Sequence, residues 1–226
     1  MTGPSSNQPL HLMPRRRFLR NVTLVSGAAV AGVLSPWGDA SAAPSMSLTE
    51  IRRALNLQTP QALDAYEPVA LTPGELETLK SATERLIPTD ELGPGAIEAG
   101  VFVFIDQALA GGSAATLPLF QAGLAALDAA AGEGGYAALD TAAQDDLITA
   151  AATGELADAP EGFFGLLLAN TRGGFFSDPI WGGNKNFVGW DLLGYPGIKL
   201  FWSQEEQGFD AEIEPMHISV AEFQGE

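Results

Sequence analysis

The chain has 226 residues, of which 28 are Asp or Glu and 11 are Lys or Arg, so its formal net charge is −17 at pH 7. A surface this acidic repels phosphate backbones and anionic lipid headgroups, which argues against nucleic-acid binding. The sequence contains no cysteine, and this excludes disulfides, thiolate-held iron–sulfur clusters and Cys-x-x-Cys-His haem attachment.

The N-terminal residues have the pattern of an export signal. Arg15 and Arg16 are followed, after one residue, by Phe18 and Leu19, which is the twin-arginine pattern. The apolar run from 22 to 34 is shorter than the ~20 residues that a membrane-spanning helix needs. We interpret it as the core of a signal for the twin-arginine translocase; the alternatives are an uncleaved anchor or a chance basic patch.

A cleavage site follows the apolar run. Ala40-Ser41-Ala42 has small residues at the required spacing, so we expect cleavage between Ala42 and Ala43 and a periplasmic mature protein. Twin-arginine export carries proteins that have already folded, often with a cofactor or partner bound. We divide the chain into a signal at 1–42, an N-terminal arm at 43–70, one helical domain at 71–201 and an acidic tail at 202–226.

The residues Thr72-Pro73-Gly74-Glu75 have the pattern of a helix start. Thr72 is a favourable N-cap, Pro73 suits the first helical position, and Glu75 completes a capping box. Apolar residues then recur at the 3.6-residue period until Pro88 ends the helix. This apolar face consists of Leu76, Leu79, Thr83, Leu86 and Ile87.

Four more helices are predicted from apolar periodicity and from the caps and glycines that bound them. Their expected ranges are 97–108, 117–131, 140–153 and 160–171. Short glycine turns join these segments. The sequence therefore predicts an all-α fold, a compact bundle of about five short helices with a long C-terminal loop region rich in glycine and aromatic residues.

The tail has a different character. From Ser203 onward the sequence has seven acidic residues and no basic one, and Met216, Ile218 and Val220 alternate with polar positions. This alternation favours a weak strand, but a single strand needs a partner to be stable. We expect the tail either to be disordered or to complete a surface that another polypeptide supplies.

A search for reactive groups finds little. His217 is the only histidine outside the signal, so a site with several histidine ligands is impossible and a histidine-based triad has one candidate in the tail. The acidic pairs Asp90-Glu91, Asp145-Asp146 and Glu205-Glu206 are typical of solvated surfaces. We expect no catalytic, cofactor-binding or metal-binding residue in this chain.

The segment from Gly173 to Gly197, GGFFSDPIWGGNKNFVGWDLLGYPG, has the most unusual composition. Its glycines allow tight turns, Pro179 and Pro196 restrict the backbone, and its six aromatic residues supply a large apolar area. Trp and Tyr often anchor protein–protein contacts, because one end packs while the other forms hydrogen bonds. The alternatives are that the rings only fill the base of the domain, or that they stack on sugars.

Two segments resemble the gluconate 2-dehydrogenase subunit 3 family, namely residues 79–109 and 173–197. The resemblance covers roughly Leu71 to Phe201, and Trp181 stands where family members often have tyrosine. The matching motifs are Ile87-Pro88, Gly93 to Ala96, Ile105-Asp106, Asp178-Pro179 with Gly182-Gly183-Asn184, Gly189-Trp190 and Gly194 to Gly197. The candidate partner-binding residues are Phe176, Asp178, Pro179, Trp181, Asn184, Trp190, Tyr195 and Pro196.

The resemblance implies a cofactor-free accessory subunit. In the family, the large subunit is an FAD-containing dehydrogenase of sugars, sugar acids or alcohols that typically lacks its own signal, and a cytochrome c subunit carrying haem c often completes a membrane-associated complex. The small subunit would bind, stabilise and escort the flavoprotein through export. The alternative is a free-standing periplasmic carbohydrate-binding protein or hydrolase that uses Trp181, Trp190 and Tyr195.

Overall fold

The computed structural model describes residues 63–199, 201–208 and 213–220, so the predicted signal with Arg15, Arg16, Phe18, Leu19 and its cleavage site lies outside the described residues. In these ranges the chain is helical and contains no strand, which confirms the all-α prediction, with six helices rather than about five. The helices are α3 (Pro73–Leu86), α4 (Val101–Ala110), α5 (Leu117–Ala131), α6 (Thr141–Thr153), α7 (Phe163–Phe176) and α8 (Val188–Leu193).

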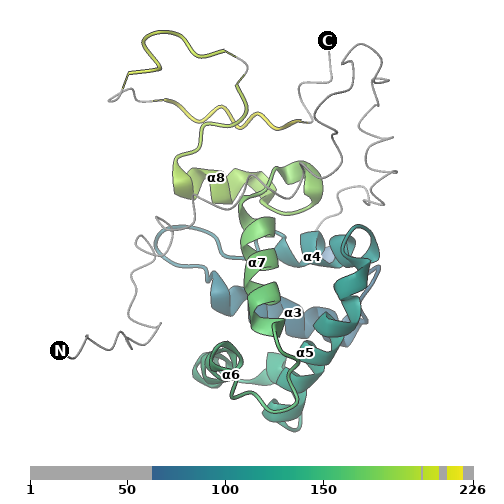
Figure 1. The fold of residues 1–226 in the computed structure, drawn as a ribbon. Coiled ribbons are helices and arrows are strands. Elements are labelled where there is room, and N and C mark those ends of the chain that lie inside the picture. Colours follow the sequence, from purple (N-terminus) through teal and green to yellow (C-terminus); the bar gives the residue numbers. More distant parts are fainter. Residues whose placement is uncertain (1–62, 200, 209–212, 221–226) are drawn as a thin grey trace, which may run out of the picture. The chain divides into compact units, whose positions relative to one another are not determined.

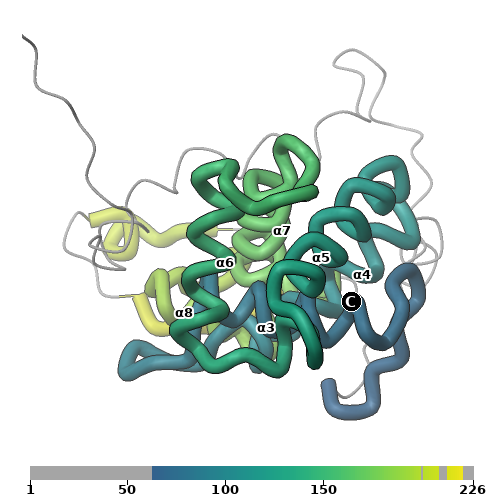
Figure 2. The backbone as a smooth tube through the Cα atoms, turned by 90° about the horizontal axis from the view of Figure 1, so that it is seen from below, coloured from purple at the N-terminus to yellow at the C-terminus, as the bar shows by residue number. Residues whose placement is uncertain are grey.

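Helix α7 is the centre of the domain and contacts each of the other five helices. Figure 1 shows α5 and α6 near its N-terminal end and α8 across its C-terminal end. Figure 2, seen from below, shows α5 and α6 side by side. The apolar faces of these helices meet in one core, whose fully buried side chains include Leu79, Ile105, Phe120, Leu124, Leu127, Leu167 and Phe175.

The start of α3 is confirmed in detail. The Thr72 hydroxyl accepts a hydrogen bond from the Glu75 backbone N–H at 3.3 Å, and the Glu75 carboxylate accepts one from the Thr72 N–H at 2.7 Å. This reciprocal pair satisfies two donors that a helix start otherwise leaves open. The expected ends of α5 before Gly132 and of α6 before Gly154 are confirmed too.

The prediction that the second helix begins near Ile97 is wrong, because α4 starts at Val101. Gly100 adopts a left-handed backbone conformation with φ 73° and separates a turn at 96–100 from the helix. Glycine adopts this conformation without steric cost. Ile97 is exposed in that turn, and its N–H donates to the Glu84 carboxylate, which also accepts from the Thr89 N–H.

The prediction that the fifth helix spans about 160–171 is also wrong at both ends. Gly162 is left-handed and delays the start of α7 to Phe163, and the helix continues through Gly173 and Gly174 to Phe176. These glycines are poor helix formers. The Phe104 side chain of α4 packs against them, so close that a Cβ on Gly174 would lie 3.0 Å from its ring, and this packing favours glycine there.

Residues 66–71 are fixed to the domain by Asp106 of α4. The Asp106 carboxylate is fully buried and accepts hydrogen bonds from the Tyr66 hydroxyl and from the N–H groups of Val69, Ala70 and Leu71, at 2.7 to 3.1 Å. Burial, and then the hydrogen bond to Asp106, raises the pKa of Tyr66 well above its ordinary value. The Ile-Asp motif thus anchors the segment that leads into α3.

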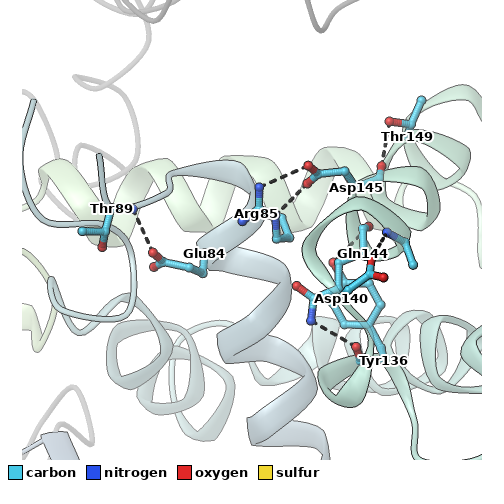
Figure 3. A network of polar contacts seen from close by, with 9 residues as sticks. Glu84, Arg85, Thr89, Tyr136, Asp140, Gln144, Asp145 and Thr149 are labelled. Atoms are coloured by element: carbon cyan, nitrogen blue, oxygen red, sulfur yellow. Dashed lines mark hydrogen bonds and ion pairs between the residues drawn. The ribbon is translucent and has the colours of Figure 1, made fainter. Parts of the chain in front are cut away.

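Polar contacts also attach α6 to its neighbours (Figure 3). The Arg85 guanidinium of α3 donates to both carboxylate oxygens of Asp145, at 2.6 and 3.1 Å. The Tyr136 hydroxyl donates to the Gln144 carbonyl, and the Gln144 amide donates back to the Tyr136 carbonyl. Burial raises the pKa of Tyr136 above its ordinary value. Asp145, a member of one of the predicted acidic pairs, therefore forms an ion pair with another helix of the domain.

One helical stretch in the described part of the chain, Ala114–Ala131, is long and apolar enough to span a membrane by length and composition alone. It comprises a short 3-10 turn and α5. Phe120, Leu124 and Leu127 on this stretch are fully buried in the core of the domain. These three residues belong to the face that packs against α3 and α7, and 28% of the stretch is buried within the structure.

Candidate partner-binding surface

The floor of the candidate surface is the C-terminal end of α7. A Cβ at Gly183 would lie 2.1 Å from the carbonyl oxygen of Gly174, and a Cβ at Gly189 would lie 1.9 Å from that of Phe175. No side chain can be accommodated at such distances, so only glycine lets the 178–187 loop and α8 reach the backbone of α7. This contact explains two glycines of the sequence motifs.

Asp178 and Asn184 hold the loop on this floor. Asp178 caps the short turn Pro179–Trp181, where its Oδ1 accepts from the Ile180 N–H at 2.9 Å. Asn184 is fully buried; its Nδ2 donates to the Ser177 carbonyl and its Oδ1 accepts from the Gly189 N–H, both at 2.8 Å. Asn184 therefore positions the loop from inside and does not present its amide to a partner.

The aromatic rings divide into an inner and an outer group. Trp190 is only 5% exposed, and its Nε1 donates to the Phe176 carbonyl at 3.0 Å. Its ring contacts those of Phe187 and Tyr195, at centroid distances of 5.3 and 4.9 Å. Tyr195 is exposed, whereas Trp181 and Phe176 are half-buried. Trp190 is thus the buried ring against which Phe187 and Tyr195 pack.

Residues 216–220 of the tail pack against this same region. The Met216 N–H donates to the Pro196 carbonyl, the Ile198 N–H to the Ile218 carbonyl, and the Val220 N–H to Asp178 Oδ2, at 2.8 to 2.9 Å. Residues 216–220 are therefore paired within their own chain, and among the described residues the predicted alternation of apolar residues corresponds to a single parallel bridge, between Gly197 and Ile218, rather than to a strand.

His217 has a structural contact at the centre of that tail segment. Its Nε2 lies 2.6 Å from Asp191 Oδ1, and its ring stacks on Phe187 at 4.9 Å with an interplanar angle of 7°. The residue has a positive φ of 51°, which is uncommon outside glycine. His217, the candidate for a histidine-based triad, therefore attaches residues 216–220 to α8 and the residue before it.

Several large apolar side chains are exposed around the C-terminal end of α8 and just after it. They are Leu193, Tyr195, Phe201, Trp202 and, from the tail, Val220. The Tyr195 N–H donates to the Trp190 carbonyl of α8, and the Val220 N–H donates to Asp178, which holds two of these residues at the backbone. A held backbone that presents apolar side chains to solvent is suited to binding another polypeptide, because less ordering is left to be done on binding.

The structure brings the eight candidate residues into one region but gives them different roles. Tyr195 is exposed; Phe176, Pro179, Trp181 and Pro196 are half-buried; Asp178, Asn184 and Trp190 hold the region together. The motif-based selection missed Leu193, Phe201 and Trp202. A scan for large apolar residues next to the aromatic segment would have found Phe201 and Trp202.

Among the described residues, no group of three or more His, Asp or Glu side chains is arranged to hold a metal ion. Asp178 and Asp191, the carboxylates nearest to the aromatic region, accept hydrogen bonds from within the chain.

A family model for gluconate 2-dehydrogenase subunit 3 matches residues 73–197. The match begins at the first residue of α3 and ends just after α8, so it includes the whole helical domain and the aromatic segment. No curated protein and no solved structure matches the chain.

Proposed function

The chain belongs to the gluconate 2-dehydrogenase subunit 3 family, and on that premise we propose that it is a non-catalytic small subunit of a flavin-dependent dehydrogenase complex. It binds and stabilises an FAD-containing large subunit that oxidises a sugar, sugar acid or alcohol. It also escorts this folded flavoprotein through twin-arginine export to the periplasm. A cytochrome c subunit carrying haem c is a further partner, and the complex associates with the membrane through its other subunits.

The observation that carries the binding part of this proposal is the exposed aromatic surface on a fixed backbone. Tyr195 and Leu193 are exposed at the end of the matched segment, while Gly183, Gly189 and Asn184 hold the backbone beneath them. Exposed apolar residues gathered in one region, rather than scattered singly, commonly mark a protein–protein interface. The acidic chain makes nucleic acid and anionic membrane poor partners for this surface.

The export part of the proposal rests on the sequence. Arg15, Arg16, Phe18 and Leu19 form the twin-arginine pattern, and that pathway transports folded proteins together with bound partners. A flavoprotein without its own signal would then need a signal-bearing partner that recognises its folded state. The proposed surface gives this chain a means of such recognition.

The alternative of a carbohydrate-binding protein is less well supported. Sugar stacking needs open faces of aromatic rings, but Trp190 is almost completely buried, and His217 stacks on a face of Phe187. Of the three rings considered for this role, Tyr195 is exposed and Trp181 is half-buried. We therefore do not propose this activity.

The proposal is tested by export in the source organism. With Arg15→Lys and Arg16→Lys together, both this chain and the flavoprotein should remain in the cytoplasm, as measured by immunoblot and by FAD content of the two fractions. Arg17→Lys, at the variable position of the pattern, is the matched control and should leave export unchanged. If the flavoprotein still reaches the periplasm at the parental level in the double variant, the escort role is wrong.

Binding is tested separately by isolating the full chain through an affinity tag. A yellow complex with one FAD per chain is the expected result, and a colourless monomer would contradict the role of a flavoprotein subunit. Absorbance of the bound flavin and mass spectrometry of the co-purified polypeptide provide the two measurements.

A further inference from the structure

The C-terminal segment, residues 216–220, covers part of the candidate partner surface. In Figure 1 it belongs to the yellow trace on the side of α8 away from α7. The family model matches residues 73–197, so the segment lies outside the match. The groups that it contacts lie inside the match, apart from Ile198 directly after it. A part of the chain that the family model does not include thus rests on motifs that it does include.

The covered groups belong to the aromatic segment. The His217 ring stacks on Phe187 at a centroid distance of 4.9 Å, so one face of the Phe187 ring is already occupied. Asp178 Oδ2 accepts a backbone N–H from the C-terminal segment at 2.8 Å, and so does the Pro196 carbonyl. Asp178 and Pro196 are two of the eight residues predicted to bind a partner. A partner that contacts these groups therefore competes with the chain's own tail for them.

The attachment of the C-terminal segment is made largely at the solvent boundary. The side chains of His217 and Asp191, which lie 2.6 Å apart, are 42% and 46% exposed, and water replaces such a contact at small cost. Among the described residues the backbone pairing is limited to one bridge, between Gly197 and Ile218. Ser219 is the one buried residue of the segment. These contacts favour local opening of the segment while the helices stay folded.

The closed arrangement also holds unfavourable backbone conformations on both sides of the ring stack. His217 has a φ of 51° and Phe187 has a φ of 62°, a range that residues other than glycine rarely adopt. When the segment leaves, the His217 backbone is free to return to an ordinary conformation, and this lowers the cost of opening. Backbone strain of this kind is common in switch regions.

We infer that the C-terminal segment is an autoinhibitory strap, which occupies the partner surface of the free chain and is displaced when the flavoprotein subunit binds. The inference rests on the proposed function, because that function supplies the partner. The strap itself indicates the chemistry of the flavoprotein segment that replaces it. That segment offers backbone N–H groups to Asp178 and the Pro196 carbonyl, a carbonyl to the Ile198 N–H, and a planar side chain to Phe187.

The first test measures the Kd of the flavoprotein subunit for the full-length chain. A closed strap raises the apparent Kd, because only the open fraction of the chain is competent to bind. His217→Ala weakens the strap and should lower the Kd by about fivefold, the same factor by which amide exchange in the strap should rise. Glu214→Gln is the matched control, since Glu214 is exposed in the tail and takes part in none of the strap contacts described above. Its Kd should equal that of the parent chain.

The sign of the change in Kd separates the strap from two other roles. A higher Kd in His217→Ala would mean that residues 216–220 are part of the interface. An unchanged Kd together with faster amide exchange in the strap would mean that the flavoprotein binds elsewhere. Either result overturns the strap while the proposed function stands, whereas a parent chain that binds no flavoprotein ends the proposed function itself.

The second test needs no substitution and compares the parent chain alone with the parent chain in the complex. Hydrogen exchange at the Met216 and Val220 amides should be faster in the complex, because their acceptors, the Pro196 carbonyl and Asp178, have been taken over. Exchange at the Gly189 amide, which donates to Asn184 beneath the surface, should not become faster. Equal or greater protection of Met216 and Val220 in the complex would overturn displacement, whatever the Kd of His217→Ala.

Discussion

Two non-helical segments of this chain are attached to the helical domain by aspartates. One attachment is buried, and the other lies at the solvent boundary. Residues 66–71 lie over α4 and donate a hydroxyl and three N–H groups to Asp106, which is fully buried. Residues 216–220 lie over α8, where Asp178 accepts one N–H and the exposed Asp191 contacts His217. The same chemical group thus performs an attachment in an apolar interior and another at the solvent boundary.

The difference bears on function. A buried acceptor with several donors couples its segment to the stability of the whole domain, because breaking the contact leaves polar groups unsatisfied in the interior. An exposed contact is replaced by water at small cost. We therefore expect the N-terminal segment to behave as part of the core, and the C-terminal segment to detach more easily than it. The candidate partner surface lies beside the second segment.

The largest effect expected is that of Asp106→Asn. The amide would direct its NH2 group at donors and would leave at least one buried N–H or hydroxyl without an acceptor. We expect a loss of about 3 kcal/mol or more in the free energy of unfolding, measured by urea denaturation followed by circular dichroism. Asp146→Asn, on the exposed side of α6, is the control and should change stability little. A small loss of stability in Asp106→Asn would mean that residues 66–71 are not attached more firmly than residues 216–220.

The next effect concerns the floor beneath the C-terminal segment. In Gly189→Ala the added methyl would lie 1.9 Å from the Phe175 carbonyl oxygen, so α8 must move away from α7, at a cost of about 1–3 kcal/mol. Hydrogen exchange should rise in residues 178–198 and remain parental in α3 to α6.

Gly165→Ala is the matched control for this substitution. Gly165 is also helical, but a Cβ there meets no atom within 4 Å, so alanine should stabilise α7 by up to about 1 kcal/mol. If Gly189→Ala is as harmless as Gly165→Ala, α8 does not rest on α7 as closely as the structure places it.

Alkaline pH should lower the free energy of unfolding of the helical domain gradually. Burial raises the pKa of Tyr66 and of Tyr136 above their ordinary value of 10.0. The unfolded chain therefore loses these protons first, so the stability that they contribute is complete below pH 10 and decreases as pH rises above it. Each tyrosine should contribute a slope of about 1.4 kcal/mol per pH unit in that window.

Tyr66→Phe isolates one of these two contributions. Urea denaturation between pH 9 and 11.5 should show a slope about half that of the parent chain, because only Tyr136 remains. An unchanged slope would mean that Tyr66 ionises as readily in the folded protein as in the unfolded chain, and the N-terminal segment would then be less well sealed than its contacts with Asp106 indicate.

Local signals in the sequence identified much of the helical body. Thr72 with Glu75, Asp140, Gly132 and Gly154 act within a few residues of their own position, and the structure places a helix boundary at each of them. Such caps depend on hydrogen bonds between sequence neighbours. They can therefore be recognised without knowing the fold.

The errors arose where distant residues decide. Gly173 and Gly174 lie inside α7 on a face where Phe104, far away in the sequence, packs closely, and residues 216–220 are paired through the contact of Ile218 with Gly197. Asn184 lies in a glycine-rich loop, which led us to select it as a partner-binding residue. Its hydrogen bonds to Ser177 and Gly189 instead direct its side chain into the domain. Propensity carries no information about such contacts, since they exist only once the helices have assembled.

The segment of residues 201–208 is an intermediate case. Ser203 and Glu206 have the spacing of a capping box, so the turn was recognisable from the sequence. The exposure of Phe201 was not, because the same ring could equally have packed on α8. Predicting an interface residue requires knowledge of what the fold leaves uncovered.

The smallest effect expected is that of His217→Ala, which tests whether the C-terminal segment detaches alone. Loss of the exposed contact to Asp191 and of the stack on Phe187 should cost about 1 kcal/mol or less. Hydrogen exchange at the Met216 and Val220 amides should therefore rise about fivefold, while the melting temperature of the domain stays parental.

Two substitutions at the same position separate the ring from the hydrogen bond. His217→Phe keeps an aromatic ring over Phe187 and loses the contact to Asp191, whereas His217→Gln keeps a donor for Asp191 and loses the stack. Because Asp191 Oδ1 is exposed and water can replace its partner, the phenylalanine variant should protect the amides of residues 216–220 better than the glutamine variant does. A fall in the melting temperature comparable to that of Asp106→Asn would show instead that the tail is as much a part of the core as residues 66–71.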